Sequence, residues 1–148
     1  MGRIFDTVRA FLDGEGNRHE VFEGATALRF GFKTGTAQWT CVIEVREAQD
    51  LIIVASLLPG AVAVAHRPAV TETMMRINHV LSVGNFDMDL DTGTQRFRTS
   101  VDLEGSEVGP AIVKQLLHAN LSTVARYIGA LERVAAGAVP TEALAAVA

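Results

Sequence analysis

The spacing of apolar and polar residues changes several times along this chain, and each change predicts a different element. Near the start, apolar side chains recur every three or four residues until two glycines interrupt them, which predicts a helix over residues 3–13. The segments 27–34 and 37–47 instead alternate apolar with polar residues, as half-buried strands do. Thr34-Gly35-Thr36 is expected to form the hairpin turn between them.

The middle of the chain is more uniformly apolar. Residues 51–58, LIIVASLL, are apolar on both faces. Because the connections are too short for parallel crossovers, we expect a central antiparallel strand that is covered, at least in part, on both sides. An apolar connector, GAVAVAHRP, leads to a helical stripe from about Pro68 to Val83. A last helix is predicted from about Pro110 to Gly137, followed by a frayed or loosely helical tail.

Three aspartates at alternate positions, Asp87, Asp89 and Asp91, are the best chemical lead. They fit the first ligand positions of an EF-hand calcium loop, but Thr92 stands where that loop needs glycine and Arg98 where it needs a bidentate glutamate. The aspartates also alternate with apolar residues, as strands do and ion-binding loops do not. We therefore favour a β-hairpin over a metal site.

The hairpin predicts a definite pairing between its strands. A two-residue turn at Thr92-Gly93 and a four-residue turn from Asp91 to Thr94 give the same register. Opposite charges directly across a strand pair contribute roughly 0.2–1 kcal/mol each, so the hairpin needs no ligand. The expected pairs are Asp89 with Arg96, Asp87 with Arg98, Met88 with Phe97, and Phe86 with Thr99.

The predicted elements follow the order helix, three strands, helix, two strands, helix. This order indicates an α+β protein in which helices pack against an antiparallel sheet of about five strands. With 148 residues, the chain is long enough to form one core. We expect a single domain over residues 1–137 and a short tail over residues 138–148.

Composition and charge narrow the function classes. The chain is 49% hydrophobic and 20% charged, and none of its apolar runs is long enough for a membrane span. Its first residues lack the uninterrupted apolar stretch of a signal peptide, which predicts a cytoplasmic protein. The formal net charge of −4, with scattered basic residues, argues against nucleic-acid binding.

Catalytic and metal-binding patterns are not evident in the sequence. The histidines, His19, His66, His79 and His118, fall in four separate elements without a metal-ligand spacing. Cys41 lies among strand residues on the expected core face, where it behaves as a small hydrophobe. We therefore expect no catalytic residue, metal or cofactor. The outer sheet face should be mixed in charge, with Arg29, Lys33, Arg46, Arg96 and Arg98 beside Glu44, Asp87, Asp89 and Asp102.

Two segments, RINHVLSVGNFDMDLDTGTQRFRTSVDLEG and NLSTVARYIGALERVAAG, resemble the YbjN-like family, described as candidate regulators of bacterial sensory transduction. The resemblance covers about residues 3–137 and departs at Ile128-Gly129, where the family often has Phe-Pro. Members are similar in fold to type III secretion chaperones, which are small dimeric α+β proteins that hold segments of other proteins. The resemblance therefore implies a binding role without a cofactor.

These observations favour a non-enzymatic regulatory or chaperone-like protein that binds a partner polypeptide, as a homodimer. Sheet edges and apolar helix faces are the natural docking surfaces, by strand addition or by helix-in-groove contact. The connector from Ala61 to Ala65 is one candidate surface, although packing under a helix also explains it. The alternative is a small-molecule or ion sensor with a pocket between helices and sheet, lined by Asn78, His79 and Asn120. An enzyme is the third possibility.

Overall fold

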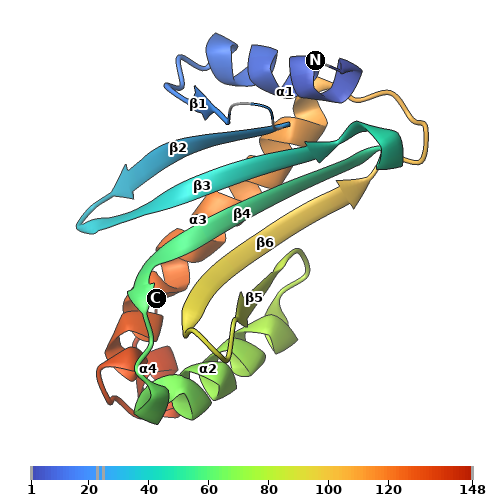
Figure 1. The fold of residues 1–148 in the computed structure, drawn as a ribbon. Helices are drawn as coiled ribbons and strands as arrows, with labels where there is room; N and C mark the ends of the chain where they lie inside the picture. Colours follow the sequence, from blue (N-terminus) through green and yellow to red (C-terminus); the bar gives the residue numbers. More distant parts are fainter. Residues whose placement is uncertain (1, 23, 25, 148) are drawn as a thin grey trace.

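A computed structural model of the chain describes residues 2–22, 24 and 26–147. It contains a six-stranded antiparallel sheet in the order β1-β2-β3-β4-β6-β5 (Figure 1). The strands are β1 Glu20–Val21, β2 Ala27–Thr34, β3 Ala37–Arg46, β4 Leu51–Ala61, β5 Asn85–Met88 and β6 Thr94–Asp102. The helices are α1 Arg3–Gly14, α2 Arg67–Val80, α3 Pro110–Ala135 and α4 Pro140–Ala145, with short 3-10 turns η1 at Glu47–Gln49 and η2 at Val64–His66. The predicted α+β class and element order are confirmed, and β1 is an additional strand.

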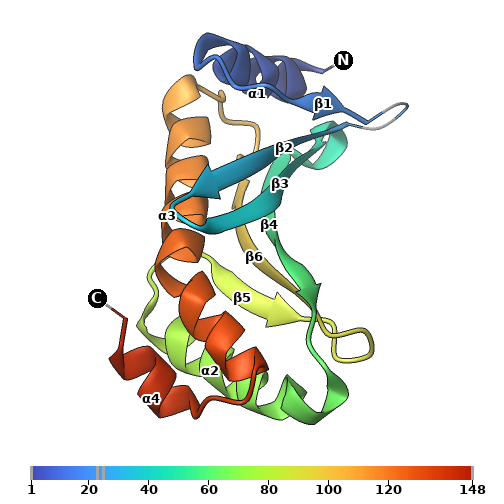
Figure 2. The same ribbon diagram turned by 90° about the vertical axis from the view of Figure 1, so that its left-hand side faces the viewer.

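The helices cover one face of the sheet. The long helix α3 crosses the sheet diagonally, with α1 near one of its ends and α2 and α4 near the other (Figures 1 and 2). Figure 2 shows the sheet bowing toward α3, while the opposite face carries no described helix. We call this opposite side the open face.

The core is divided into two clusters of buried side chains along α3. The first cluster joins α1 and the N-terminal half of α3 to the part of the sheet that lies nearer α1. The second cluster joins α2, α4 and the C-terminal half of α3 to the part of the sheet that lies nearer α2. Phe32 and Leu121 pack against both clusters. Apolar positions repeat along the length of α3, which is why one helix serves both clusters.

Strand β4 is fully buried on its helix side and partly buried on its second face, which agrees with the expected partial cover. β4 is central, between β3 and β6, and its residues Ile52 and Val54 are buried against the helices. On the open face Ile53 and Ala55 are only half-buried, and Leu57 is 43% exposed. An apolar strand whose second face is only partly buried leaves apolar surface available for another molecule.

The second hairpin has the predicted faces but a different register. Phe86 pairs with Phe97, and Asp87 pairs with Arg96, two residues away from the expected partner. The cause is the loop: the Asp89 amide donates to the Thr94 carbonyl at 2.9 Å, so residues 90–93 lie outside the ladder. A shift by an even number keeps every side chain on its predicted face.

Two other boundaries differ from the prediction. Helix α2 ends at Val80, three residues early, because Leu81 already has extended backbone and Gly84 has a φ of +79°. The tail after Gly137 forms the short helix α4, in which Ala143 is buried. The Arg133 guanidinium donates to the Ala143 carbonyl at 3.2 Å and ties α4 to α3.

Candidate functional site

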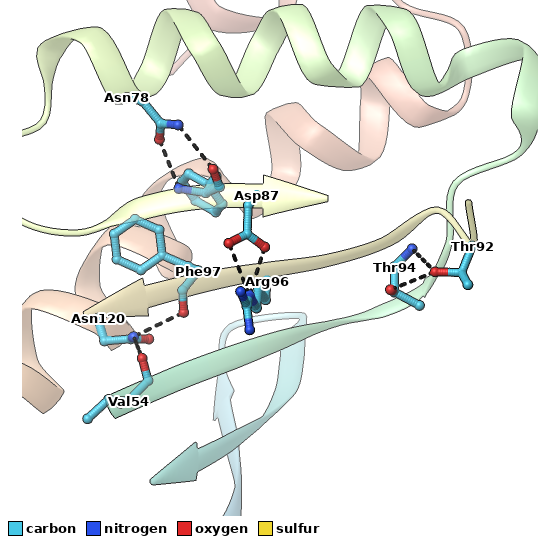
Figure 3. Close-up of polar contacts among 9 residues, drawn as sticks. Val54, Asn78, Asp87, Thr92, Thr94, Arg96, Phe97 and Asn120 are labelled. Carbon is cyan, nitrogen blue, oxygen red and sulfur yellow. Dashed lines mark hydrogen bonds and ion pairs between the residues drawn. The ribbon is translucent and has the colours of Figure 1, made fainter. Parts of the chain in front are cut away.

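The aspartates of the second hairpin act in the sheet. Asp87 accepts two hydrogen bonds from Arg96 Nε, at 2.8 and 3.0 Å, across the strand pair on the open face (Figure 3). Asp89 Oδ1 instead accepts from the Asp91 amide at 2.9 Å within the loop. The hairpin interpretation is therefore confirmed. Within the described residues, histidine, cysteine and carboxylate side chains do not gather in threes as a metal site requires.

The histidines and the cysteine lie in unrelated places. His79 and His118 are exposed, and His66 is half-buried near the start of α2. His19 has its Nδ1 3.1 Å from the Asn17 carbonyl and its Nε2 3.8 Å from Asp13. Cys41 is fully buried in β3, where desolvation raises the pKa of its thiol to about 12 against the opposing effect of a Ser56 hydrogen bond. A thiol with that pKa is protonated at neutral pH and is a poor nucleophile.

Asn120 of α3 holds the helix to the sheet through a buried network. Its Oδ1 accepts from Ser56 Oγ at 2.5 Å, and Ser56 Oγ in turn accepts from Trp39 Nε1 at 2.9 Å. Its Nδ2 donates to the Val54 and Phe97 carbonyls at 3.0 and 3.2 Å (Figure 3). The side-chain amide is thus fully engaged by the sheet, which is what a buried polar group requires.

Asn78 of α2 has a different role at the edge of the sheet. Its Oδ1 accepts from the Phe86 amide at 2.8 Å, and its Nδ2 donates to the Phe86 carbonyl at 3.0 Å (Figure 3). The side chain therefore takes the place of a neighbouring strand. The three residues suggested for a sensor pocket, Asn78, His79 and Asn120, do not converge on a cavity, because two amides bond to the backbone and His79 is exposed.

The open face carries an apolar strip with a charged surround. The strip consists of aliphatic residues that alternate with core residues on β3 and β4: Val42, Leu51, Ile53, Ala55 and Leu57. Three ion pairs lie beside it, Arg29 with Glu20 at 2.7 Å, Arg46 with Glu44 at 2.6 Å, and Arg96 with Asp87 at 2.8 Å. This face therefore carries both positive and negative side chains, as predicted. Its apolar centre was visible in the pattern of residues 51–57, and the expected partial cover leaves Leu57 exposed.

Two shallow hollows lie on the open face beside the strip. They adjoin and share Gly31 and Thr40, a directly paired position of β2 and β3. One hollow extends to Arg18 and Arg29, and the other reaches Leu57 of the apolar strip. We call this combined feature the Gly31 groove. The connector from Ala61 to Ala65, the other candidate surface, does not form one continuous apolar face, because Val62 is buried whereas Val64 is 73% exposed.

The comparisons with known proteins agree with this architecture. The model of the YbjN family, "Putative bacterial sensory transduction regulator", matches residues 5–133. The chain belongs to the YbjN family. No curated protein has significant sequence similarity to this YbjN-family chain.

Three solved structures share the fold of this YbjN-family protein. A chain in the HopA1–SchA chaperone–effector complex has a TM-score of 0.55 at 10% identity, over 83% of this chain and 92% of that one. E. coli YbjN, a putative transcription regulator, has a TM-score of 0.54 at 17% identity, over 82% and 91%. A chain in the ExsC–ExsE complex has a TM-score of 0.58 at 8% identity, over 84% and 90%. The predicted likeness to type III secretion chaperones is confirmed as a likeness of fold.

The helices of this YbjN-family protein are not suited to crossing a bilayer. None that the structure describes combines the length and the apolar character that a membrane span needs.

Proposed function

We propose that this YbjN-family protein is a non-enzymatic, chaperone-like regulator that binds a segment of a partner polypeptide. The observation that carries the proposal is the apolar strip of the open face. The opposite face of the same strands buries the core, so the strip contributes nothing to that core. Exposed apolar surface rimmed by charged groups is the usual form of a protein-binding site. Two structures of similar fold, at low identity, were solved as complexes of two different proteins.

A homodimer is the second part of the proposal. Within the described chain, most exposed large apolar side chains lie on α2, in its flanking turns or in the β5–β6 loop, which Arg67 of α2 contacts: Val64, Met75, Val80, Val83 and Leu90. A second copy that packs on this region would remove these side chains from water and would leave the open face available. Light scattering is expected to give a dimer for the wild type and a monomer after Met75→Glu with Val80→Glu. A monomeric wild type at micromolar concentration would contradict the dimer.

Leu57→Asp tests partner binding on the open face. Leu57 is 43% exposed and occupies the end of the strip, so the charge should weaken docking with little effect on folding. Affinity-tagged wild type should retain a partner from lysate of the source cells that Leu57→Asp loses. Val139→Asp, at a residue 50% exposed beside α4, is the matched control. Equal retention by wild type and Leu57→Asp would exclude the open face, and no retained protein would contradict the function.

A further inference from the structure

The two edges of the sheet differ in what their backbone groups contact. At the β5 edge, the outward amide and carbonyl of Phe86 are both bonded to Asn78, so α2 closes that edge at this position. A capped edge of this kind resists pairing with another chain. The opposite edge of the sheet is formed by β1 and β2.

The ladder shows which groups of β2 face outward. The Phe22 amide donates to the Ala27 carbonyl at 3.0 Å on the outer side, whereas the Val45 amide donates to the Thr26 carbonyl at 2.8 Å on the inner side. Successive residues of an antiparallel strand alternate in this respect, so Gly31 and Lys33 also face outward. Strand β1 pairs only as far as Arg29. Beyond it, no described group bonds to the outward amides and carbonyls of Gly31 and Lys33.

The open face beside this edge is not crowded by side chains at Gly31. Gly31 lies on the open face, and a Cβ built there would have nothing within 4 Å. A glycine inside a strand often marks a place where another backbone approaches closely. The Gly31 groove adjoins this edge, and one of its two hollows reaches Leu57 of the apolar strip.

The charges around the edge favour an acidic segment. Arg18 and Lys33 are exposed at the two ends of the unpaired stretch and belong to none of the described ion pairs. The carboxylate that lines the groove, Glu20, is held by Arg29 at 2.7 Å. The edge therefore has two uncompensated cations, which attract carboxylates and repel basic segments.

We propose that the partner adds an extended acidic segment to the outer edge of β2. Its backbone bonds to the amides and carbonyls of Gly31 and Lys33, and its carboxylates meet Arg18 and Lys33. This inference rests on the proposed function, because it specifies the partner segment of a polypeptide-binding protein. Strand addition supplies backbone hydrogen bonds, and the flanking charges supply selectivity.

Three short labelled peptides test the inference by fluorescence anisotropy. The first alternates threonine with glutamate, the second has lysine in place of glutamate, and the third is the acidic peptide with N-methyl groups on two successive central residues. The N-methyl groups remove amide donors toward both edges of the peptide. We expect the acidic peptide to bind at least about tenfold more tightly than either of the others, with affinity falling as salt increases.

Variants locate the binding to this edge. Arg18→Glu with Lys33→Glu should reverse the preference, so that the basic peptide becomes the tighter ligand. Gly31→Pro removes the outward amide and should weaken the acidic peptide by at least about tenfold, since proline is tolerated on an edge strand. Lys114→Glu, a single charge reversal of the same kind at an exposed position of α3, should leave the affinities unchanged. Circular dichroism melting confirms that each variant is folded.

Several outcomes would overturn the inference. These are equal affinity for acidic and basic peptides, full binding of the N-methylated peptide, no binding of any peptide, or insensitivity to the Arg18 and Lys33 changes. If wild type retains a lysate partner while one of these results is obtained, the proposed function stands and only the β2 edge is excluded. If the lysate also yields no partner, both proposals fail.

Discussion

At the scale of single residues, Asn120 shows how one polar side chain fixes the position of a helix on a sheet. Its side-chain amide forms hydrogen bonds with four groups on β4 and β6. Its removal would leave the buried Ser56 Oγ without a hydrogen-bond acceptor. Buried polar groups that lose their partners destabilise a protein more than the hydrogen bonds themselves stabilise it.

Asn120→Ala is therefore expected to lower the free energy of unfolding by about 2–4 kcal/mol. Urea unfolding followed by circular dichroism measures the change. Ser122→Ala is the control, because Ser122 lies two residues further along α3 and is exposed; its effect should stay within a few tenths of a kcal/mol. Similar losses for the two variants would show that the network does not stabilise the fold.

Cys41 gives a pH dependence with a definite sign. Burial raises the pKa of its thiol from 9.0 to about 12. The unfolded chain therefore releases this proton first, and the stability linked to the thiol is complete below pH 9 and is lost as the pH rises toward 12. The loss is at most about 1.4 kcal/mol for each pH unit in that window.

The comparison with Cys41→Ala isolates this effect from other titrating groups. The difference in unfolding free energy between wild type and Cys41→Ala should be constant from pH 7 to about pH 8.5 and should then shift against the wild type by roughly 1–2 kcal/mol near pH 10.5. Urea titrations at each pH provide the measurement. A difference that does not change with pH would mean that the thiolate is not penalised in the folded state.

At the level of secondary-structure elements, the second hairpin shows two separate effects. The alternation of residues determines which side chains share a face, whereas the loop determines which residues pair. The sequence predicted that Asp87 faces Arg98, whereas the structure pairs Asp87 with Arg96. The two registers make different predictions for the energetic coupling between side chains, because direct cross-strand partners interact more strongly than diagonal ones.

Double-mutant cycles distinguish these registers. Replacing Asp87 and Arg96 by alanine, singly and together, should give a coupling of about 0.3–0.8 kcal/mol that decreases in high salt. The same cycle with Asp87 and Arg98 is the control and should give a smaller coupling. A larger value for the Arg98 cycle would support the register predicted from sequence and contradict the structure.

The fold was largely predictable from local pattern, and the errors have physical causes. Alternation placed the core residues of β2, β3 and β6 on one face, because burial imposes a period of two on a strand. Strand β1 has two residues, too few for a period, and the hairpin register depended on whether Leu90 belonged to the strand or to the loop. For the candidate site, the apolar outer face of β4 was visible in LIIVASLL. How far that face is buried depends on how the helices and strands pack, which the local pattern does not specify. The capping of Phe86 by Asn78 likewise depends on how α2 docks.

At the scale of the whole molecule, α3 connects two clusters that would otherwise form separate cores. Its N-terminal half packs with α1 and its C-terminal half with α2 and α4. Strands β3 and β4 also contribute to both clusters: Cys41 and Ile43 belong to the first, and Trp39 and Leu58 to the second. Because the same helix and the same strands are shared, we expect the two clusters to unfold in one cooperative transition.

Leu12→Ala provides the decisive measurement. Leu12 is 1% exposed in the first cluster, and its truncation should destabilise the fold by about 2–5 kcal/mol. The single tryptophan, Trp39, belongs to the second cluster and reports on it by fluorescence. In a cooperative molecule the Leu12→Ala change must shift the Trp39 transition by as much as it shifts the helical signal. If the fluorescence midpoint stays at its wild-type value while the helical signal unfolds in two steps, the halves are independent. In that case the open face would lie across two separately folding units and could not act as one rigid surface for a partner.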